Sequence, residues 1–143
     1  MVPIIPTQGK HGLMAATLSA IMLGANTSRV HLFTNPYTPD LTTTPASFTE
    51  AAFAGYAPIA LPLAIDHGID GSGDDDWYFN SIAWTASGGG LPETIYGYWI
   101  DYVNPVTSAL SILWCQRFDT PFAFIHAGDT LPLILTIGGT QGT

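Results

Sequence analysis

The sequence is poor in charged side chains, and above all in basic ones. Charged residues make up 10% of it, whereas an average soluble domain has about 25%. Its only basic side chains are Lys10, Arg29 and Arg117, and the net charge is −8. Binding to phosphates of nucleic acid or to an anionic membrane surface requires clusters of Lys and Arg. The composition therefore excludes nucleic-acid and membrane partners and favours protein or glycan partners.

This shortage of charge also constrains the surface of the folded chain. Charged side chains keep a free-standing domain hydrated and prevent its self-association. With so few of them, much of the surface must consist of Thr, Ser, Asn, Gly, Pro and aromatic side chains. We therefore expect a domain that other subunits cover in an assembly. The alternative is an acidic, Thr-rich extracellular domain that stays monomeric.

Cysteine is nearly absent, and so are the patterns of common enzymes. The single cysteine, Cys115, excludes intrachain disulfides, and its apolar run Ile112–Cys115 predicts a buried, inert thiol. The chain has no GxSxG, P-loop or dinucleotide-binding pattern. We expect no enzyme activity. The alternative is glycan hydrolysis by a carboxylate pair in which Glu50 or Glu93 acts with an Asp.

The hydrophobic stretches are too short to span a bilayer, which takes roughly 20 apolar residues. The stretch Gly12–Ala25 has its apolar residues at helical spacing, and we expect a helix over Leu13–Leu23. The preceding Met1–Gly9 contains Pro3 and Pro6, which remove backbone donors, and it is expected to be an extended arm. Arm and helix form the segment 1–27.

From residue 28 onward the sequence favours β-structure. Apolar runs separated by turn residues recur at roughly the 8–12-residue spacing of a sandwich. The expected strands are Arg29–Thr34, Tyr56–Ile65, Trp77–Thr85, Thr94–Tyr102, Ser108–Phe118, Pro121–His126 and Leu131–Ile137, with a helical turn at Ser47–Ala52. We predict an all-β domain over 28–143, an antiparallel β-sandwich of jelly-roll type.

The expected strand Thr94–Tyr102 is apolar on both faces, whereas a sheet with one wet face alternates apolar and polar residues. Its second face needs cover from the helix, the arm or another subunit. We expect partner contacts from the arm, the helix and the Pro-rich loop Asn35–Pro45. The predicted contact residues are Val2, Ile4, Ile5, Leu13, Leu18, Pro36, Tyr37 and Pro39.

The Asp- and Gly-rich loop over 66–76 is the best candidate for a metal site. Asp66, Asp70 and Asp74 occupy the first, fifth and ninth places of a calcium loop. The twelfth place is Trp77, where a bidentate Glu belongs, so the calcium-loop pattern fails. The four histidines share no spacing typical of zinc ligands. We expect no cofactor and a solvated acidic turn, with calcium at these aspartates as the alternative.

Several segments, in this order along the chain, resemble those of a known family. They are Val30–Pro39, Phe48–Tyr56, Thr94–Trp99, Arg117–Asp119 and Ala127–Leu131. Together they resemble small structural proteins of tailed bacteriophages. The resemblance implies a β-sandwich virion component, with roles that range from capsid decoration to tail or fibre parts.

Composition and resemblance together lead to one functional expectation. We expect a capsid decoration (cement) protein on the virion surface that binds the major capsid protein and copies of itself, as a homotrimer. It would bind by burying apolar and aromatic surface together with the arm. The alternative is a tail or fibre component that binds host-surface glycan through exposed aromatic side chains and the Asp-rich loop.

Overall fold

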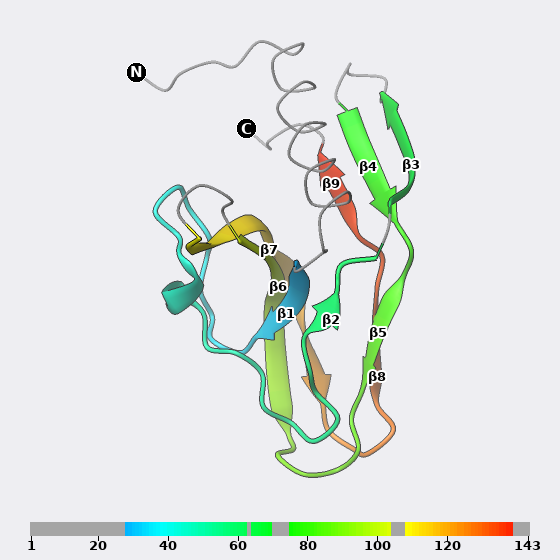
Figure 1. The fold of residues 1–143 in the computed structure, drawn as a ribbon. Helices are drawn as coiled ribbons and strands as arrows, with labels where there is room; N and C mark the ends of the chain where they lie inside the picture. Colours follow the sequence, from blue (N-terminus) through cyan, green and yellow to red (C-terminus); the bar gives the residue numbers. More distant parts are fainter. Residues whose placement is uncertain (1–27, 63, 70–74, 104–107, 139–143) are drawn as a thin grey trace. The chain divides into compact units, whose positions relative to one another are not determined.

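The computed structural model describes residues 28–62, 64–69, 75–103 and 108–138 (Figure 1). These residues fall into two compact units. The larger unit comprises residues 27–61 and 82–133, and the smaller one includes residues 62–81 and 134–143. The predicted arm and helix lie outside the described residues, so the predicted division into 1–27 and 28–143 stays a prediction.

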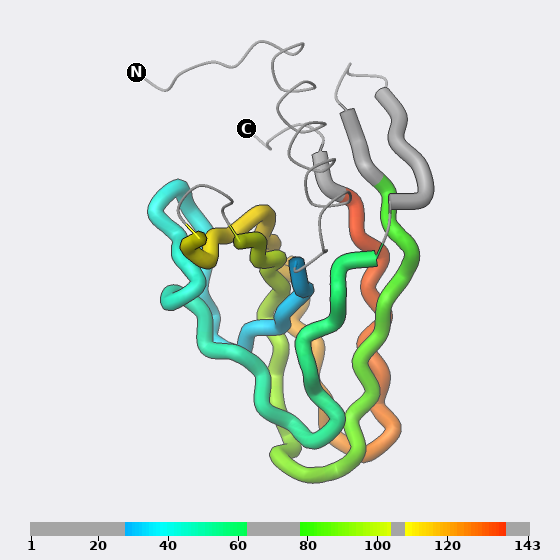
Figure 2. The backbone as a smooth tube through the Cα atoms, viewed as in Figure 1, coloured from blue at the N-terminus to red at the C-terminus, as the bar shows by residue number. Residues whose placement is uncertain are grey.

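The larger unit is built on a four-stranded antiparallel sheet. Its strands, in order across the sheet, are β2 (Ile59–Ala60), β1 (Arg29–Phe33), β6 (Glu93–Val103) and β7 (Leu110–Phe124). β1 and β6 are far apart in sequence but adjacent in the sheet, where Val30–Phe33 pair with Gly97–Ile100. The tube in Figure 2 follows the long loop that leads from β1 to β2. This loop contains the 3₁₀ turn η1 (Pro45–Ser47).

Two smaller antiparallel sheets contain the remaining strands. In the larger unit, β5 (Ile82–Thr85) pairs with β8 (Thr130–Leu133). In the smaller unit, β4 (Asp75–Phe79) lies between β3 (Ala64–Ile69) and β9 (Thr136–Gly138). The predicted all-β, antiparallel class is confirmed for the described residues. A sandwich or jelly roll stays a prediction.

Proline explains two differences between the predicted and observed strands. The strand predicted over Tyr56–Ile65 is interrupted near Pro62, between β2 and β3. The strands predicted before and after Thr120 are instead one strand, β7, which tolerates Pro121 because it lies at the sheet edge. Pro121 also lies in a bulge, since Ile95 of β6 pairs with Phe122 of β7 whereas Gly97 pairs with Arg117.

Two other local predictions were wrong. The helical turn starts at Pro45 rather than Ser47, because proline suits the first position of a helix. Ser47 instead ends the turn and accepts the Thr44 N–H through its hydroxyl at 3.1 Å. The acidic segment over 66–76 is not all loop, since Asp66 lies within β3 and Asp75 begins β4.

The core of the larger unit depends on large side chains from several elements. Its completely buried side chains include Val30, Leu32, Phe33, Ile95, Ile100 and Phe124. Phe53, from the loop after β1, packs on Phe124 with ring centroids 4.2 Å apart. Gly97 makes room for Phe33, because a Cβ at Gly97 would lie 2.7 Å from the Phe33 ring and would collide with the Gln116 carbonyl.

Gly97→Ala is therefore expected to destabilise the fold by roughly 1–3 kcal/mol, since the added methyl group overpacks the sheet. Urea unfolding measures the change in free energy. The control is Gly89→Ala, whose Cβ would meet only the Ala54 Cβ, at 3.4 Å. Equal stability of the two variants would contradict the close packing of Phe33 on Gly97.

The turn between β7 and β8 is held by one carboxylate. Asp129 accepts hydrogen bonds from the backbone N–H groups of His126 at 2.8 Å and Ile125 at 2.7 Å. These bonds hold the pKa of the Asp129 carboxyl below its usual value. The carboxylate therefore stabilises the fold above the unfolded-state pKa, about 3.9, and this contribution is lost as the pH falls through the lower folded-state pKa.

Asp129→Asn is thus expected to be less stable than the unmodified chain at pH 7, with the difference shrinking as the pH falls below about 4. Urea unfolding at pH 7 and pH 3 measures this. Asp119→Asn, at an exposed carboxylate of β7, serves as the control. A difference for Asp129→Asn that persists unchanged at pH 3 would contradict the role given to its charge.

Candidate functional site

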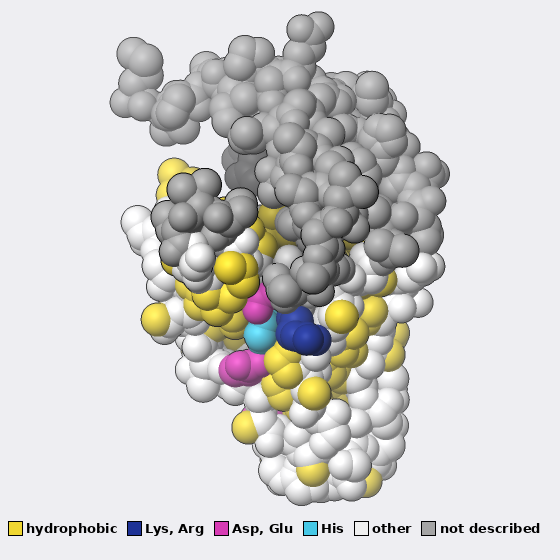
Figure 3. All heavy atoms as spheres, viewed as in Figure 1, with side chains coloured by type: hydrophobic (Ala, Val, Ile, Leu, Met, Phe, Trp, Pro, Cys, Tyr) yellow, Lys and Arg dark blue, Asp and Glu magenta, His cyan; other side chains and the backbone are white. Residues whose placement is uncertain are grey.

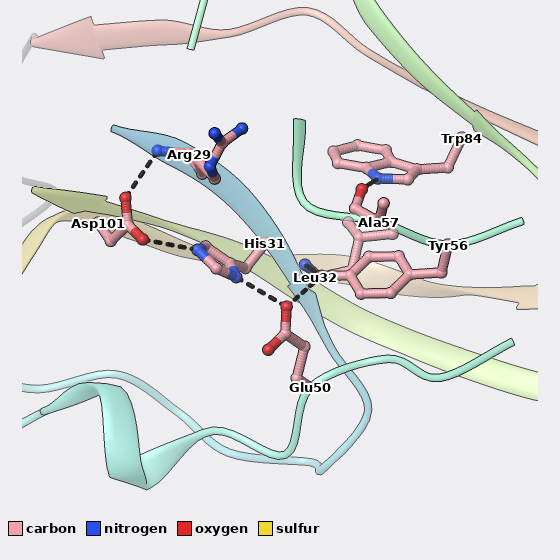
Figure 4. A network of polar contacts seen from close by, with 8 residues as sticks. All are labelled: Arg29, His31, Leu32, Glu50, Tyr56, Ala57, Trp84 and Asp101. Atoms are coloured by element: carbon pink, nitrogen blue, oxygen red, sulfur yellow. Dashed lines mark hydrogen bonds and ion pairs between the residues drawn. The ribbon is translucent and has the colours of Figure 1, made fainter. Parts of the chain in front are cut away.

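A network of polar side chains links β1, β6 and the loop after β1 (Figure 4). The His31 ring lies between two carboxylates: its Nδ1 is 2.7 Å from Glu50 Oε1, and its Nε2 is 2.8 Å from Asp101 Oδ2. The other Asp101 oxygen accepts the Arg29 backbone N–H at 2.6 Å. His31 and Asp101 are only 8% and 7% exposed, whereas the Glu50 side chain is 42% exposed.

Strand register brings these residues together. His31 pairs with Trp99, and Asp101, two residues further along β6, lies on the same face of that strand. Glu50 is brought to β1 by an isolated β-bridge with Phe33. On the face in Figure 3, acidic, basic and histidine side chains gather in one place among hydrophobic and uncharged ones.

Both ring nitrogens of His31 lie within hydrogen-bond distance of a carboxylate oxygen. Glu50 and Asp101 thus engage the ring from its two sides. With both ring nitrogens engaged, neither is free to bind a metal.

An aromatic stack covers this face of β6. The His31 ring stacks on Trp99, with centroids 4.0 Å and planes 9° apart. Phe48 also stacks on Trp99, and Tyr37 contacts Phe48 edge-on at 5.6 Å. The cover that the sequence requires for this part of β6 is therefore supplied by the chain's own loop.

Tyr56 completes the network. Its hydroxyl donates to Glu50 Oε1 at 2.7 Å and accepts the Leu32 backbone N–H at 3.1 Å. Burial raises the pKa of Tyr56 far above its usual value, so the phenol stays a neutral donor. Glu50 thus receives hydrogen bonds from both Tyr56 and His31, which fasten the loop to the sheet.

The contacts of the two glutamates bear on the hydrolase alternative. Glu50 and Asp101 both bind His31, instead of facing each other across an open substrate site as a glycosidase pair does. Glu93 accepts the backbone N–H groups of Ala52 and Phe53. Both glutamates therefore have structural partners. Within the described ranges, no three His, Cys, Asp or Glu side chains are arranged to hold a metal ion.

Hydrogen bonds between its own residues brace the loop Asn35–Pro45, which was predicted to contact partners. Asp40 Oδ1 accepts hydrogen bonds from the Thr42 N–H at 2.8 Å and hydroxyl at 2.7 Å, and these bonds lower the pKa of Asp40. The Thr43 hydroxyl accepts the Asp40 N–H at 2.7 Å and contacts the Tyr37 hydroxyl. Between them, Leu41 is 94% exposed. The turn therefore presents a leucine to solvent on a fixed backbone.

The predicted site residues have different outcomes. Pro36, Tyr37 and Pro39 lie in the braced loop Asn35–Pro45. Pro36 is exposed there, and the other two are half-buried. Asp70 and Asp74 lie outside the described residues. So do the predicted contact residues of the arm and helix, which are Val2, Ile4, Ile5, Leu13 and Leu18.

Two expectations at the residue level changed. Cys115 is half-buried rather than buried, and burial raises the pKa of its thiol, which disfavours the reactive thiolate. The role of Asp101 was missed. The signal was available, because Asp101 is the one charged residue between Thr94 and Tyr102 in an otherwise apolar strand.

In comparisons with known proteins, the chain matches no family model, no curated protein and no solved structure. In the part of the chain that is described, no helix is long and apolar enough to cross a membrane.

Asp101→Asn is expected to cost about 3 kcal/mol in unfolding free energy, because it removes one partner of the buried contact between Asp101 and His31. Glu50→Gln is the control, since the more exposed Glu50 carboxylate contributes about 1 kcal/mol or less. Urea unfolding of both variants measures the difference. Similar losses in the two would show that the Asp101 contact is not the stronger one.

Proposed function

We propose that this chain is a virion structural protein: a capsid decoration (cement) protein of a tailed bacteriophage, without enzyme activity. It lies on the capsid surface and binds the major capsid protein and copies of itself, as a homotrimer. A sandwich of jelly-roll type belongs to the same proposal. It is supported by side chains buried from both sheets of the larger unit, among them Leu32, Ile100, Trp84 and Leu131.

The observation that carries the proposal is Leu41 on its braced turn. A leucine that is 94% exposed gains about 1.5–3 kcal/mol when a partner buries it. The hydrogen bonds around Asp40 fix the backbone before binding, so little conformational entropy is lost on docking. An apolar side chain at the tip of a preorganised loop is suited to binding in an apolar pocket of another protein.

The surroundings of Leu41 fit a partner that is not strongly charged. The segment Thr38–Thr44 has one charged residue, Asp40, and its carboxylate is occupied by the neighbouring threonines. Proline and threonine make up most of the rest. Burying this segment therefore leaves few charges to desolvate, which favours contact with an apolar protein surface.

Repetition makes such a contact effective on a shell. One leucine and a short loop give a modest affinity, but linked copies bind with far greater avidity than any single copy. A trimer presents three Leu41 loops at fixed spacing. The mechanism we propose is reinforcement of the shell by many weak, identical contacts.

Leu41→Asp is expected to weaken binding of the purified chain to capsid shells of the same phage at least tenfold, since the carboxylate would have to be buried. Co-sedimentation with shells that lack the chain measures binding. Ala46→Asp, at an exposed site on η1, adds the same charge and is expected to leave binding unchanged.

Two results would contradict the assignment. One is wild-type chain that does not sediment with the shells. The other is a copy number in purified virions that fits the tail rather than the shell, which would favour the tail or fibre alternative.

A further inference from the structure

The loop Asn35–Pro45 is braced internally, but its internal hydrogen bonds do not set its direction relative to the sheet. Asp40 and Thr43 fix the turn, and the Tyr37 hydroxyl contacts the Thr43 hydroxyl at 3.1 Å. These contacts join one part of the loop to another part. The direction in which Leu41 points therefore depends on contacts between the loop and the strands.

The chain meets the sheet on both sides of this turn. After the turn, Phe48 stacks on Trp99 of β6. Before the turn, the Arg117 guanidinium of β7 donates to the Thr38 hydroxyl at 2.7 Å and, at a longer 3.4 Å, to the Pro36 carbonyl. The loop starts from β1, and β6 lies between β1 and β7. Arg117 therefore ties the first part of the loop to a strand other than the one that it leaves.

Two prolines let this contact act on Leu41. Pro36 and Pro39 each fix their own φ angle. Thr38 precedes Pro39, and a residue before proline is restricted to extended backbone. A contact at Thr38 is therefore transmitted to the turn along a stiff segment of chain, instead of being lost in bending.

The guanidinium of Arg117 is itself held in place. It lies over the ring of Tyr96, with its central carbon 5.9 Å from the ring centroid. Tyr96 is half-buried and lies at the bulge between Ile95 and Gly97 of β6. A planar guanidinium can lie over a ring and still donate from its edge, whereas an ammonium group has no such plane. The position therefore suits arginine rather than lysine.

We propose that Arg117 is a positioning residue for Leu41: it holds the first part of the loop against β7 and so sets the direction in which Leu41 is presented. The inference rests on the proposed function, because it concerns how the same contact is prepared for its partner. A partner then meets one orientation of Leu41 instead of many, which lowers the entropic cost of docking.

This role is separate from a contribution to the stability of the fold. Arg117 is exposed, and its hydrogen bond to Thr38 lies at the surface. Exposed charged contacts contribute little to the free energy of unfolding. A surface loop can nevertheless loosen locally while the sheet stays folded. Loss of the Arg117 side chain is therefore expected to affect the loop and its binding, and to leave global stability nearly unchanged.

The first test compares Arg117→Ala with Arg29→Ala in the full-length chain, by co-sedimentation with capsid shells that lack it. Both variants remove one exposed arginine, and the backbone N–H by which Arg29 contacts Asp101 is kept. We expect Arg117→Ala to weaken binding about fivefold, as for one surface hydrogen bond, and Arg29→Ala to leave it unchanged. Thr38→Val removes the acceptor hydroxyl and should reproduce the loss. It also replaces Arg117→Ala if that variant fails to fold.

Leu41→Ala decides whether Arg117 acts through Leu41. In this background Arg117→Ala is expected to cause no further loss of binding, because no leucine remains to be positioned. An additional loss of about fivefold would mean that Arg117 contacts the shell directly, and the proposal would be wrong.

A third measurement uses the purified chain alone. Backbone order parameters of residues 40–43 are expected near 0.85, roughly the value of a rigid backbone, in the unmodified chain and in Arg29→Ala. They should fall below about 0.6 in Arg117→Ala and in Thr38→Val. Urea unfolding of the same variants should show little change.

Unchanged order parameters in Arg117→Ala would overturn the inference, whatever the shells show. So would unchanged binding by a chain whose loop has loosened. An unmodified chain that does not bind shells would overturn the capsid assignment instead, and the order parameters would still decide whether Arg117 positions the loop.

Discussion

Charges that are buried next to one another must be matched, and in this chain the match is made at His31. Asp101 is buried, and its two oxygens are held by the His31 ring and by the Arg29 backbone N–H. The same ring holds Glu50, and Glu50 lies in the loop after β1. The loop is thereby fixed over β6, where its Phe48 stacks on Trp99 and its Tyr37 contacts Phe48 edge-on. The turn that presents Leu41 is positioned by a contact well inside the molecule.

The same loop both contacts β7 and exposes a side chain of its own. It meets β7 where the Arg117 guanidinium donates to the Thr38 hydroxyl at 2.7 Å. Its tip remains exposed at Leu41. A contact at this tip suits a chain with so few charged side chains, because burying a leucine needs no ion pair.

Local patterns in the sequence predicted most of the strands, and long-range contacts account for most of what they missed. Apolar runs bounded by turn residues located β1 and β6. Pro121 predicted a break, but an edge strand with a bulge accommodates it. The spacing of His31, Glu50 and Asp101 along the chain is not distinctive. The pairing of β1 with β6 brings His31 to Asp101, and the bridge between Phe33 and Glu50 brings the glutamate to them. The phage resemblance and the arm's contacts stay predictions.

The order of the strands has a consequence for synthesis on the ribosome. Neither unit is one continuous stretch of chain, because residues 62–81 interrupt the larger unit and the smaller one ends with β9. The larger unit lacks β8 until residue 133 has been made, and the smaller one needs Thr136–Gly138. Neither unit can therefore complete its sheets before these late strands have left the ribosome. Until then β5 lacks its partner β8, and its backbone groups can pair with a neighbouring nascent chain instead.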